Sequence, residues 1–227
     1  MKRLFSFIFI LLLSSSTSLF SHVQHYNKVK HLKYNLFFND ELIGYHTFDF
    51  INKDEILKVH GRGYFKVSKL GINIMEYRTS SKAEYKGNQL IKFHSNTTQN
   101  GKKKYVKIQL KDNKLHVDGS SFKGKTDITS MVSSWWNHEI VKKNKQISSI
   151  SGRVIDQKVK FLGKDKININ KNVFNSLNFH FFSNNDKPFN EKKLNIKIWY
   201  DAKTLLWIKA SYEKFGTWEY KISEVKY

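Results

Sequence analysis

The sequence contains no cysteine and only one proline, Pro188. Without cysteine the chain has no disulfide framework, no thiol nucleophile and no lipid-anchored amino-terminal cysteine, so its fold depends on a hydrophobic core. No proline-rich linker or other low-complexity segment divides the chain, and no internal repeat is present. These absences predict one domain.

Long apolar runs are also missing, apart from one near the amino terminus. Lys2 and Arg3 precede the apolar run Leu4–Leu13, and small residues follow it over Ser14–Ser21. This layout is typical of a secretory signal peptide, and the run is too short for a stable membrane-spanning helix. No later segment is apolar enough to span a membrane, so we expect no transmembrane segment after cleavage.

Signal cleavage is expected after Ser18 or Ser21, the two sites that small residues favour. We assign residues 1–21 to the signal peptide and residues 22–227 to a single domain. The expected location is the bacterial periplasm, with the outside of the cell as the alternative.

Arginine is scarce in a strongly basic chain. Lysine and arginine together number 40 and the formal net charge is +21, which falls to +19 when Lys2 and Arg3 are removed. Such a balance attracts polyanions and anionic surfaces. The arginines are Arg3, Arg62, Arg78 and Arg153. Because flexible lysines lack the bidentate fork used in specific phosphate or base recognition, we expect weak anionic-surface contact and no sequence-specific nucleic-acid binding.

A period of two residues dominates the sequence. In the stretch EILKVHGRGYFKVSKL, every second residue from Leu57 to Val67 is apolar or glycine, and the residues between them are mostly polar. The stretch KKKYVKIQLK repeats the pattern with Val106, Ile108 and Leu110 on one face. This alternation is typical of strands that bury one face.

Similar strands are predicted along the rest of the chain. Their ranges are Leu32–Phe38, Glu41–Ile51, Ile72–Tyr85, Leu90–Thr97, Val154–Leu162, Val173–Phe182, Leu194–Tyr200, Leu205–Tyr212 and Thr217–Val225. Short turn signals separate them, including Asn39-Asp40, Gly87-Asn88, Gly163-Lys164-Asp165 and Gly216. Strands joined this way pair antiparallel, and so many cannot stay one flat sheet. We predict a mainly all-β fold, an antiparallel meander curled into a barrel-like or sandwich sheet.

The segment Asp127–Lys145 breaks the alternation. Four apolar residues in it fall at nearly helical spacing: Ile128, Met131, Trp135 and Ile140. Asp127 or Thr129 is a suitable N-cap, and basic residues close the segment. We predict one short helical crossover between two groups of strands.

The stretch GSSFKGKT matches the phosphate-binding pattern G-x-x-x-x-G-K-[ST] at Gly119, Gly124, Lys125 and Thr126. A working P-loop joins a strand to a helix inside a mostly parallel sheet. The predicted sheet is antiparallel, and no apolar strand ends in an aspartate that would organise Mg²⁺. We interpret the match as a chance product of a lysine-rich composition. The alternatives are a simple basic loop that binds phosphate and a P-loop-type enzyme.

Other catalytic patterns are missing. His138-Glu139 lacks the second histidine of H-E-x-x-H, because position 142 is lysine. The sequence has no G-x-S-x-G elbow and no calcium-binding loop. We therefore predict no catalytic residue, no metal site and no cofactor.

The inner face of the predicted sheet offers one candidate binding site. Gly61 and Gly63 lie on the apolar face of their strand, where a missing side chain leaves room for an aromatic ring or a ligand. His46 lies on the inward face of the preceding strand. The side chains expected to cover this gap are Trp135, Trp136 and His138, with Trp199 or Trp207 as further lining residues. The same residues also fit a core packed with aromatic rings, so both interpretations stay open.

Four phrases occur in order from about Tyr34 to Tyr220: YNLFFNDELIGYHTFDF, SSWWNHEI, SGRVIDQKVKFLGKD and IWYDAKTLLWIKASYE. Together they resemble a family of uncharacterised exported β-sheet proteins of proteobacteria, described as a domain of unknown function. The resemblance implies an antiparallel β fold and a signal peptide but no established activity, so it transfers no functional residue. The GKT triplet is not part of the family's pattern, which favours a chance match.

Together these observations predict an exported, non-enzymatic binding protein. The expected partner is a lipid or another apolar or amphipathic envelope molecule, held against the concave face of the sheet near Trp135 and Trp136. The alternatives are a basic protein that binds polyanions or anionic surfaces, and a P-loop-type phosphate-binding enzyme.

Overall fold

The computed structural model describes Tyr26, residues 28–69 and residues 71–227. The predicted signal peptide, residues 1–21, lies outside the described residues. The strands are β1 (His31–Phe38), β2 (Glu41–Lys53), β3 (Ile56–Lys69), β4 (Ile72–Lys86), β5 (Gln89–Gln99), β6 (Lys102–Lys111), β7 (Lys114–Gly119), β8 (Phe122–Asp127), β9 (Met131–Val132), β10 (Lys145–Ile147), β11 (Val154–Ile169), β12 (Asn172–Ser183), β13 (Asn195–Asp201), β14 (Trp207–Glu213) and β15 (Thr217–Lys226). Within the fully described segments the 3₁₀ helices η2 (His138–Lys142) and η3 (Phe189–Glu191) accompany the strands.

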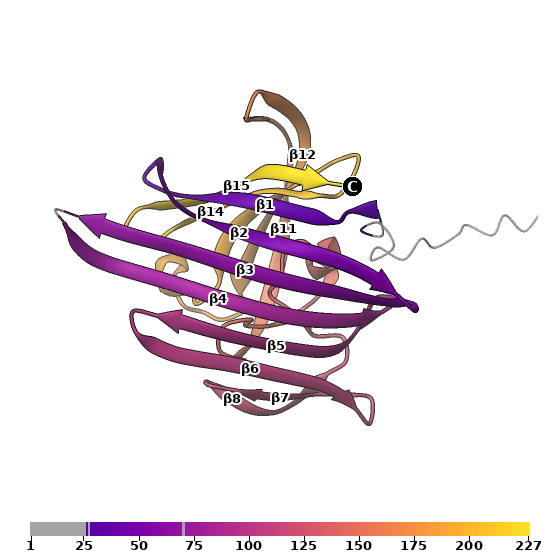
Figure 1. The fold of residues 1–227 in the computed structure, drawn as a ribbon. Helices are drawn as coiled ribbons and strands as arrows, with labels where there is room; N and C mark the ends of the chain where they lie inside the picture. Colours follow the sequence, from indigo (N-terminus) through magenta and orange to yellow (C-terminus); the bar gives the residue numbers. More distant parts are fainter. Residues whose placement is uncertain (1–25, 27, 70) are drawn as a thin grey trace, which may run out of the picture.

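All fifteen strands join one sheet whose order is β8-β7-β6-β5-β4-β3-β2-β1-β15-β14-β13-β12-β11-β10-β9. Nearly every neighbouring pair is antiparallel, because short turns connect consecutive strands. The first and last strands, β1 and β15, pair in the middle of the sheet. In Figure 1, β1–β8 form a broad front layer, and β11 crosses behind it. The predicted all-β antiparallel fold is confirmed, and the sheet keeps two free ends, β8 and β9.

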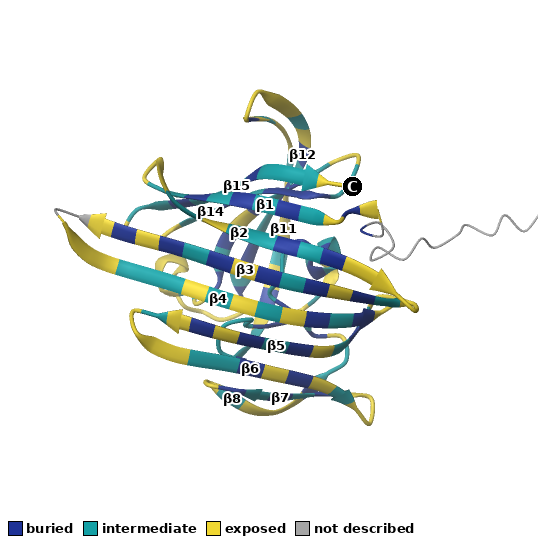
Figure 2. Cartoon of the chain, in the orientation of Figure 1, coloured by how far each residue is buried: buried dark blue, intermediate teal, exposed yellow. Residues whose placement is uncertain are grey.

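Burial follows the alternation of the sequence. On β3 the residues from Leu57 to Val67 alternate between buried and solvent-facing, and Val106 and Ile108 on β6 are buried. Figure 2 shows this as bands across the front strands. The inward side chains form one large core, and a second cluster of Leu36, Phe65, Val67 and Trp218 lies beside it.

One predicted turn is a bulge instead. Strand β11 continues through Gly163-Lys164-Asp165, and its register with β12 shifts between Phe161 and Gly163. A glycine with φ of 131° absorbs the extra residue without ending the strand. The real turn lies at Asn170 and Lys171, where both residues have positive φ, so the predicted strand Val154–Leu162 is extended to Ile169.

The predicted helical crossover is shorter and less regular than its spacing suggests. β8 extends to Asp127, and the helical part is the five-residue η2, capped by the Asn137 side chain, which accepts a hydrogen bond from Glu139 N. Upstream of η2 the backbone bonds to a neighbouring segment instead of forming a helix: Ser133 N donates to the Ile147 carbonyl oxygen at 2.8 Å. Serine side chains add further contacts, because Ser130 bonds Thr126 and Ser133 Oγ accepts from Ser149 N. The intervening β9 pairs parallel with β10.

In the described part of the chain, no helix has the length and apolar character required to cross a membrane.

Candidate functional site

The inner face of β2 and β3 brings three of the predicted site residues together. His46 lies opposite Gly63 across the strand pair, and Phe48 lies opposite Gly61. A Cβ added to Gly63 would lie 3.4 Å from the His46 ring, and one added to Gly61 would lie 3.4 Å from the Phe48 ring. The closer neighbours are on β4: the added Cβ atoms would lie 2.5 Å from Ser81 Oγ and 3.1 Å from the Thr79 Cγ2 methyl, so the two glycines make room mainly for these side chains.

Trp135 extends this group from the crossover. Its ring makes edge contacts with Trp207, at a centroid distance of 5.5 Å, and with Tyr220, at 5.9 Å. Tyr220 in turn lies 6.3 Å from His46. The inner aromatic group, defined as His46, Phe48, Trp135, Trp207 and Tyr220, is thus continuous from β2 to β15. The buried Nε1 of Trp135 has no hydrogen-bond acceptor among the described residues.

Trp136 faces another part of the interior. It is only 1% exposed and makes edge contacts with Tyr26, Phe50 and Tyr85. Its neighbour Trp135 packs against a different set of rings. The predicted tryptophan pair is therefore divided between two clusters.

Two further residues of the predicted site lie elsewhere. His138 packs edge-on against Tyr200, at 4.8 Å, and near Phe179. Trp199 donates from Nε1 to Asp165 Oδ2 at 3.0 Å. Neither joins the inner aromatic group, whereas Trp207 does.

The inner aromatic group is electrically neutral. Burial lowers the pKa of His46 to about 4, and it raises the pKa of Tyr220 and of nearby Tyr34 well above the ordinary tyrosine value. Tyr34 also donates a hydrogen bond to the Trp207 carbonyl oxygen. Such a surface suits uncharged, apolar parts of a molecule better than anions.

The P-loop-like stretch forms an antiparallel hairpin. Gly119 ends β7, and Gly124, Lys125 and Thr126 lie in β8, which pairs back onto β7. A Cβ on Gly119 would meet the Ser151 carbonyl oxygen at 2.6 Å, so this glycine serves close packing. The strand-to-helix junction on which a P-loop depends is absent around these four residues, and the Thr126 hydroxyl is hydrogen-bonded to Ser130.

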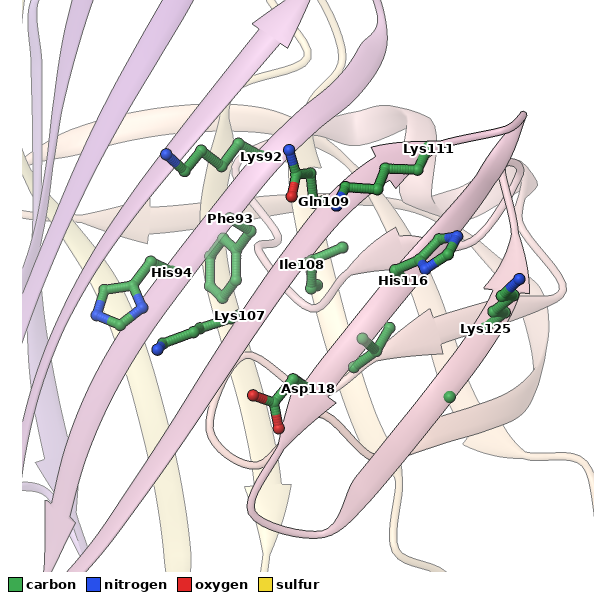
Figure 3. A pocket seen from close by; sticks show the side chains of 12 residues that line it. Lys92, Phe93, His94, Lys107, Ile108, Gln109, Lys111, His116, Asp118 and Lys125 are labelled. Carbon is green, nitrogen blue, oxygen red and sulfur yellow. The ribbon is translucent and has the colours of Figure 1, made fainter.

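A hollow of about 590 Å³ lies over the outer face of β5–β8. Its basic side chains, which define the basic hollow, are Lys92, His94, Lys107, Lys111, His116 and Lys125. Figure 3 shows them on four adjacent strands, with Gln109 and Asp118 among them. Phe93 and Ile108 of the same strands belong to the core.

The positive charge of the basic hollow exceeds the negative charge of the carboxylate that lines it, Asp118. Its lysines form no ion pair with any described residue. The nearby carboxylate of Asp118 is already engaged, because it accepts from the Tyr105 hydroxyl at 2.9 Å and pairs with Lys123 at 3.4 Å. The Tyr105 hydrogen bond and the Lys123 charge lower the pKa of Asp118. His116 Nε2 is enclosed and lacks a hydrogen-bond partner in the described residues.

Among the basic side chains of the hollow, only Lys125 was identified from the sequence as a candidate site residue, and that was as part of the P-loop-like pattern. The other basic residues come from separate strands and have no linear motif. Cross-strand register joins them: Lys92 faces Gln109, Gln109 faces His116, and His116 faces Lys125. The signal that could have found them is the outward half of the alternation in consecutive short hairpins, where turn length fixes the register.

No group of three histidine or acidic side chains suited to holding a metal ion occurs within Tyr26, 28–69 and 71–227.

Comparison with known proteins gives a family and a fold. Residues 34–223 match the family model of the domain of unknown function DUF6134. No curated protein matches the chain. Among solved structures, the chain is similar to a beta-barrel-like protein of domain of unknown function DUF1849 from Brucella abortus, with a TM-score of 0.61 and 10% identity. The similarity covers 87% of this chain and 97% of the other, and it shows a shared fold.

Proposed function

We propose that this member of the DUF6134 family, a domain of unknown function, is an exported, non-enzymatic protein. We propose further that it binds an anionic ligand in the basic hollow. The observation that carries the proposal is the set of four lysines, without carboxylate partners in the described chain, around one hollow. This develops the polyanion-binding alternative of the sequence analysis.

The size and charge of the basic hollow support this proposal. Its volume of about 590 Å³ lies within the range of about 300–1,000 Å³ usual for small-molecule sites. Lys92, Lys107, Lys111 and Lys125 supply mobile point charges, and His94, Gln109 and His116 supply further polar groups. Lysine ammonium groups lose little hydration at such an open site, so we expect affinity that falls as salt screens the charges.

Titration with inorganic phosphate and with a short heparin fragment tests the proposal. A double variant, Lys107→Gln with Lys125→Gln, removes two charges from opposite sides of the basic hollow. We expect saturable binding to the mature protein that this variant weakens severalfold. The matched control is Lys164→Gln with Lys166→Gln on β11, two exposed lysines with no part in the hollow. Equal losses in both double variants would mean that only net charge matters, and would overturn the assigned site.

A second candidate function is the binding of an apolar or amphipathic envelope molecule by the inner aromatic group. One observation favours it: the buried Trp135 Nε1 donor lacks an acceptor, beside the neutral His46. A ligand with an apolar body and one acceptor oxygen would satisfy that donor. The side chains of Ser81 and Thr79 and the neighbouring rings fill the space left by Gly61 and Gly63, so such a ligand must displace a side chain to enter.

Native mass spectrometry of protein purified from the periplasm tests the second candidate. A co-purified lipid, together with a change of tryptophan fluorescence that Trp135→Phe abolishes, would support it. The Trp199→Phe variant is the control, because Trp199 lies outside the inner aromatic group and its Nε1 already donates to Asp165 Oδ2. An unliganded mass and unchanged fluorescence across a lipid panel would remove the candidate.

Export has its own test. Intact mass spectrometry of the protein recovered from a periplasmic extract should give a mass lacking residues 1–18 or 1–21. A full-length mass in the cytoplasmic fraction alone would contradict export, whichever ligand is bound.

A further inference from the structure

We propose that the ligand of the basic hollow is a linear anionic polysaccharide that runs across the strands and continues beyond the hollow onto β4. This inference rests on the proposed anion-binding function and specifies the ligand class. The basis is the way strand register aligns basic side chains into rows that cross the outer face of the sheet.

Two rows of outward-facing side chains run at right angles to the strands. The first row is His60, Lys82, His94 and Lys107, each directly opposite the next on β3, β4, β5 and β6. The second row is Lys92, Gln109, His116 and Lys125 on β5, β6, β7 and β8. The rows overlap on β5 and β6, so together they reach from β3 to β8.

The distances between the lysines favour an extended polymeric ligand over a small anion. Lys82 on β4 and Lys107 on β6 are two strands apart, which is about 10 Å at the usual inter-strand distance. Lys125 on β8 lies two strands beyond Lys107, so the three lysines span about 19 Å. A single phosphate or sulfate group cannot contact both ends of this span, whereas an extended polyanion can contact all three lysines.

The charges along this path are available. Lys82, Lys92 and Lys107 form no ion pair with other described residues, and Lys82 is exposed. Arg62 of the neighbouring β3 is different, because it already pairs with Asp49 at 2.8 Å. Three carboxylates of the described residues border the path: Asp49 opposite His60, Glu84 opposite Lys92 and Asp118 opposite Lys107. Asp49 pairs with Arg62 and Asp118 with Lys123, and Glu84 directs the polysaccharide toward Lys82 on the first row.

The side chains favour a sugar chain over a nucleic acid. The two rows contain lysine, histidine and glutamine but no phenylalanine, tyrosine or tryptophan on which bases would stack. Neither row contains arginine, the usual fork for phosphate and guanine recognition. The neighbouring row is Arg62, Ser80, Asn96 and Tyr105. Ser80 and Asn96 supply uncharged hydrogen-bonding groups suited to sugar hydroxyls, whereas Arg62 is paired with Asp49 and the Tyr105 hydroxyl is bonded to Asp118.

A length series of heparin-derived oligosaccharides tests this inference, with Lys82→Gln as the informative variant. Lys82 lies outside the basic hollow, so its loss should leave binding of inorganic phosphate and of the shortest fragment unchanged. For fragments long enough to span β4–β8, we expect severalfold weaker binding and a log–log salt dependence shallower by about one. The matched single-charge control, Lys166→Gln on β11, should behave as wild type.

The outcomes separate this inference from the proposed function. If the shortest fragment binds at the basic hollow but affinity does not rise with length and Lys82→Gln changes nothing, the polysaccharide inference fails and anion binding stands. If neither phosphate nor any fragment binds saturably, both fail. Single-stranded oligonucleotides of equal charge are the third arm: affinity equal to that of the heparin fragments would overturn the assignment to polysaccharides.

Discussion

At the scale of single residues, missing side chains shape the inner face of β2 and β3. Gly44, Gly61 and Gly63 all face a neighbouring strand or ring at a distance that leaves little or no room for a Cβ. The alternation of the sequence predicted correctly that Gly61 and Gly63 face inward. It did not identify the rings above them, because Phe48 and His46 are placed there by the register of β2 with β3.

Gly44→Ala should destabilise the protein more than Gly63→Ala. A Cβ on Gly44 would overlap the Tyr64 carbonyl oxygen and lie 2.6 Å from Phe65 Cα, both on the backbone of β3. On Gly63 the nearest atom is the Thr79 Cγ2 methyl at 3.1 Å, which can move. We expect Gly44→Ala to lower the free energy of unfolding by about 2–3 kcal/mol or more, and Gly63→Ala by about 1 kcal/mol or less. Chemical denaturation measures both, and equal midpoints would contradict the close strand approach.

His46 should make stability depend on pH. Burial lowers its pKa from 6.5 to about 4, so between these values the unfolded chain binds a proton that the folded protein does not. The contribution is fully present above pH 6.5 and is lost as the pH falls toward 4, by roughly 3 kcal/mol in all.

The test for His46 is the difference in unfolding free energy between wild type and His46→Leu, measured from pH 7 to 4. This difference isolates His46 from the carboxylates that also titrate in the range. A difference that stays constant with pH would show that the imidazole is not buried as a neutral ring.

At the scale of elements, the crossover between β8 and β11 fills the interior of the sheet. Trp135 and Trp136 project from it into two separate clusters, and Ser149 accepts a 2.5 Å hydrogen bond from Ser95 on β5. Helical spacing in the sequence distinguished this segment from the predicted strands, but it predicted a longer helix than the five-residue η2. The spacing came from the packing positions of Trp135 and Ile140, whereas the backbone upstream of η2 pairs with β10, with Ser133 N donating to the Ile147 carbonyl oxygen.

Trp136→Ala should be among the most destabilising single substitutions. Its ring is 1% exposed and contacts Tyr26, Phe50 and Tyr85, so truncation leaves a large cavity between the crossover and the sheet. We expect a loss of about 3–5 kcal/mol in a chemical unfolding experiment. Phe215→Ala is the control, because that ring is 96% exposed and its removal should change stability by less than about 0.5 kcal/mol. A loss below 1 kcal/mol for Trp136→Ala would mean that the crossover does not anchor the sheet.

The arrangement of the strands also explains why the basic hollow and one bulge were not predicted from the sequence. Several strands were predicted to within two residues of their ends, such as Ile72–Tyr85 for β4 (Ile72–Lys86), since alternation and turn residues are local signals. The basic hollow depends on which outward residue faces which, over the four strands β5–β8. At Gly163 the sequence pattern predicted a turn, but the structure has a β-bulge. Glycine is common in both, so a local pattern does not distinguish them.

At the scale of the whole molecule, the net charge of +21 in 227 residues means that positive side chains repel one another over the entire surface. The composition gives this net charge, but the composition alone did not show that lysines without carboxylate partners gather over β5–β8. Several other lysines are paired: Lys209 and Lys221 both contact Glu219, and Lys145 contacts Asp127.

Repulsion predicts that salt stabilises the protein. The melting temperature should rise as sodium chloride increases from about 20 mM to about 500 mM, because the Debye length shortens from over 20 Å to about 4 Å. Differential scanning fluorimetry of the mature protein measures this. A melting temperature that falls with salt would show that ion pairs such as those of Glu219 outweigh the repulsion.

The pairing of β1 with β15 has a consequence for biosynthesis. A ribosome produces Leu32 long before its permanent partner Val225, and in the meantime the outer edge of β1 has no strand to bond. A copy lacking β15 would keep that edge of β1 unpaired, as a template for pairing with other chains. Synthesis of β15 therefore protects the newly made protein against aggregation before any ligand is bound.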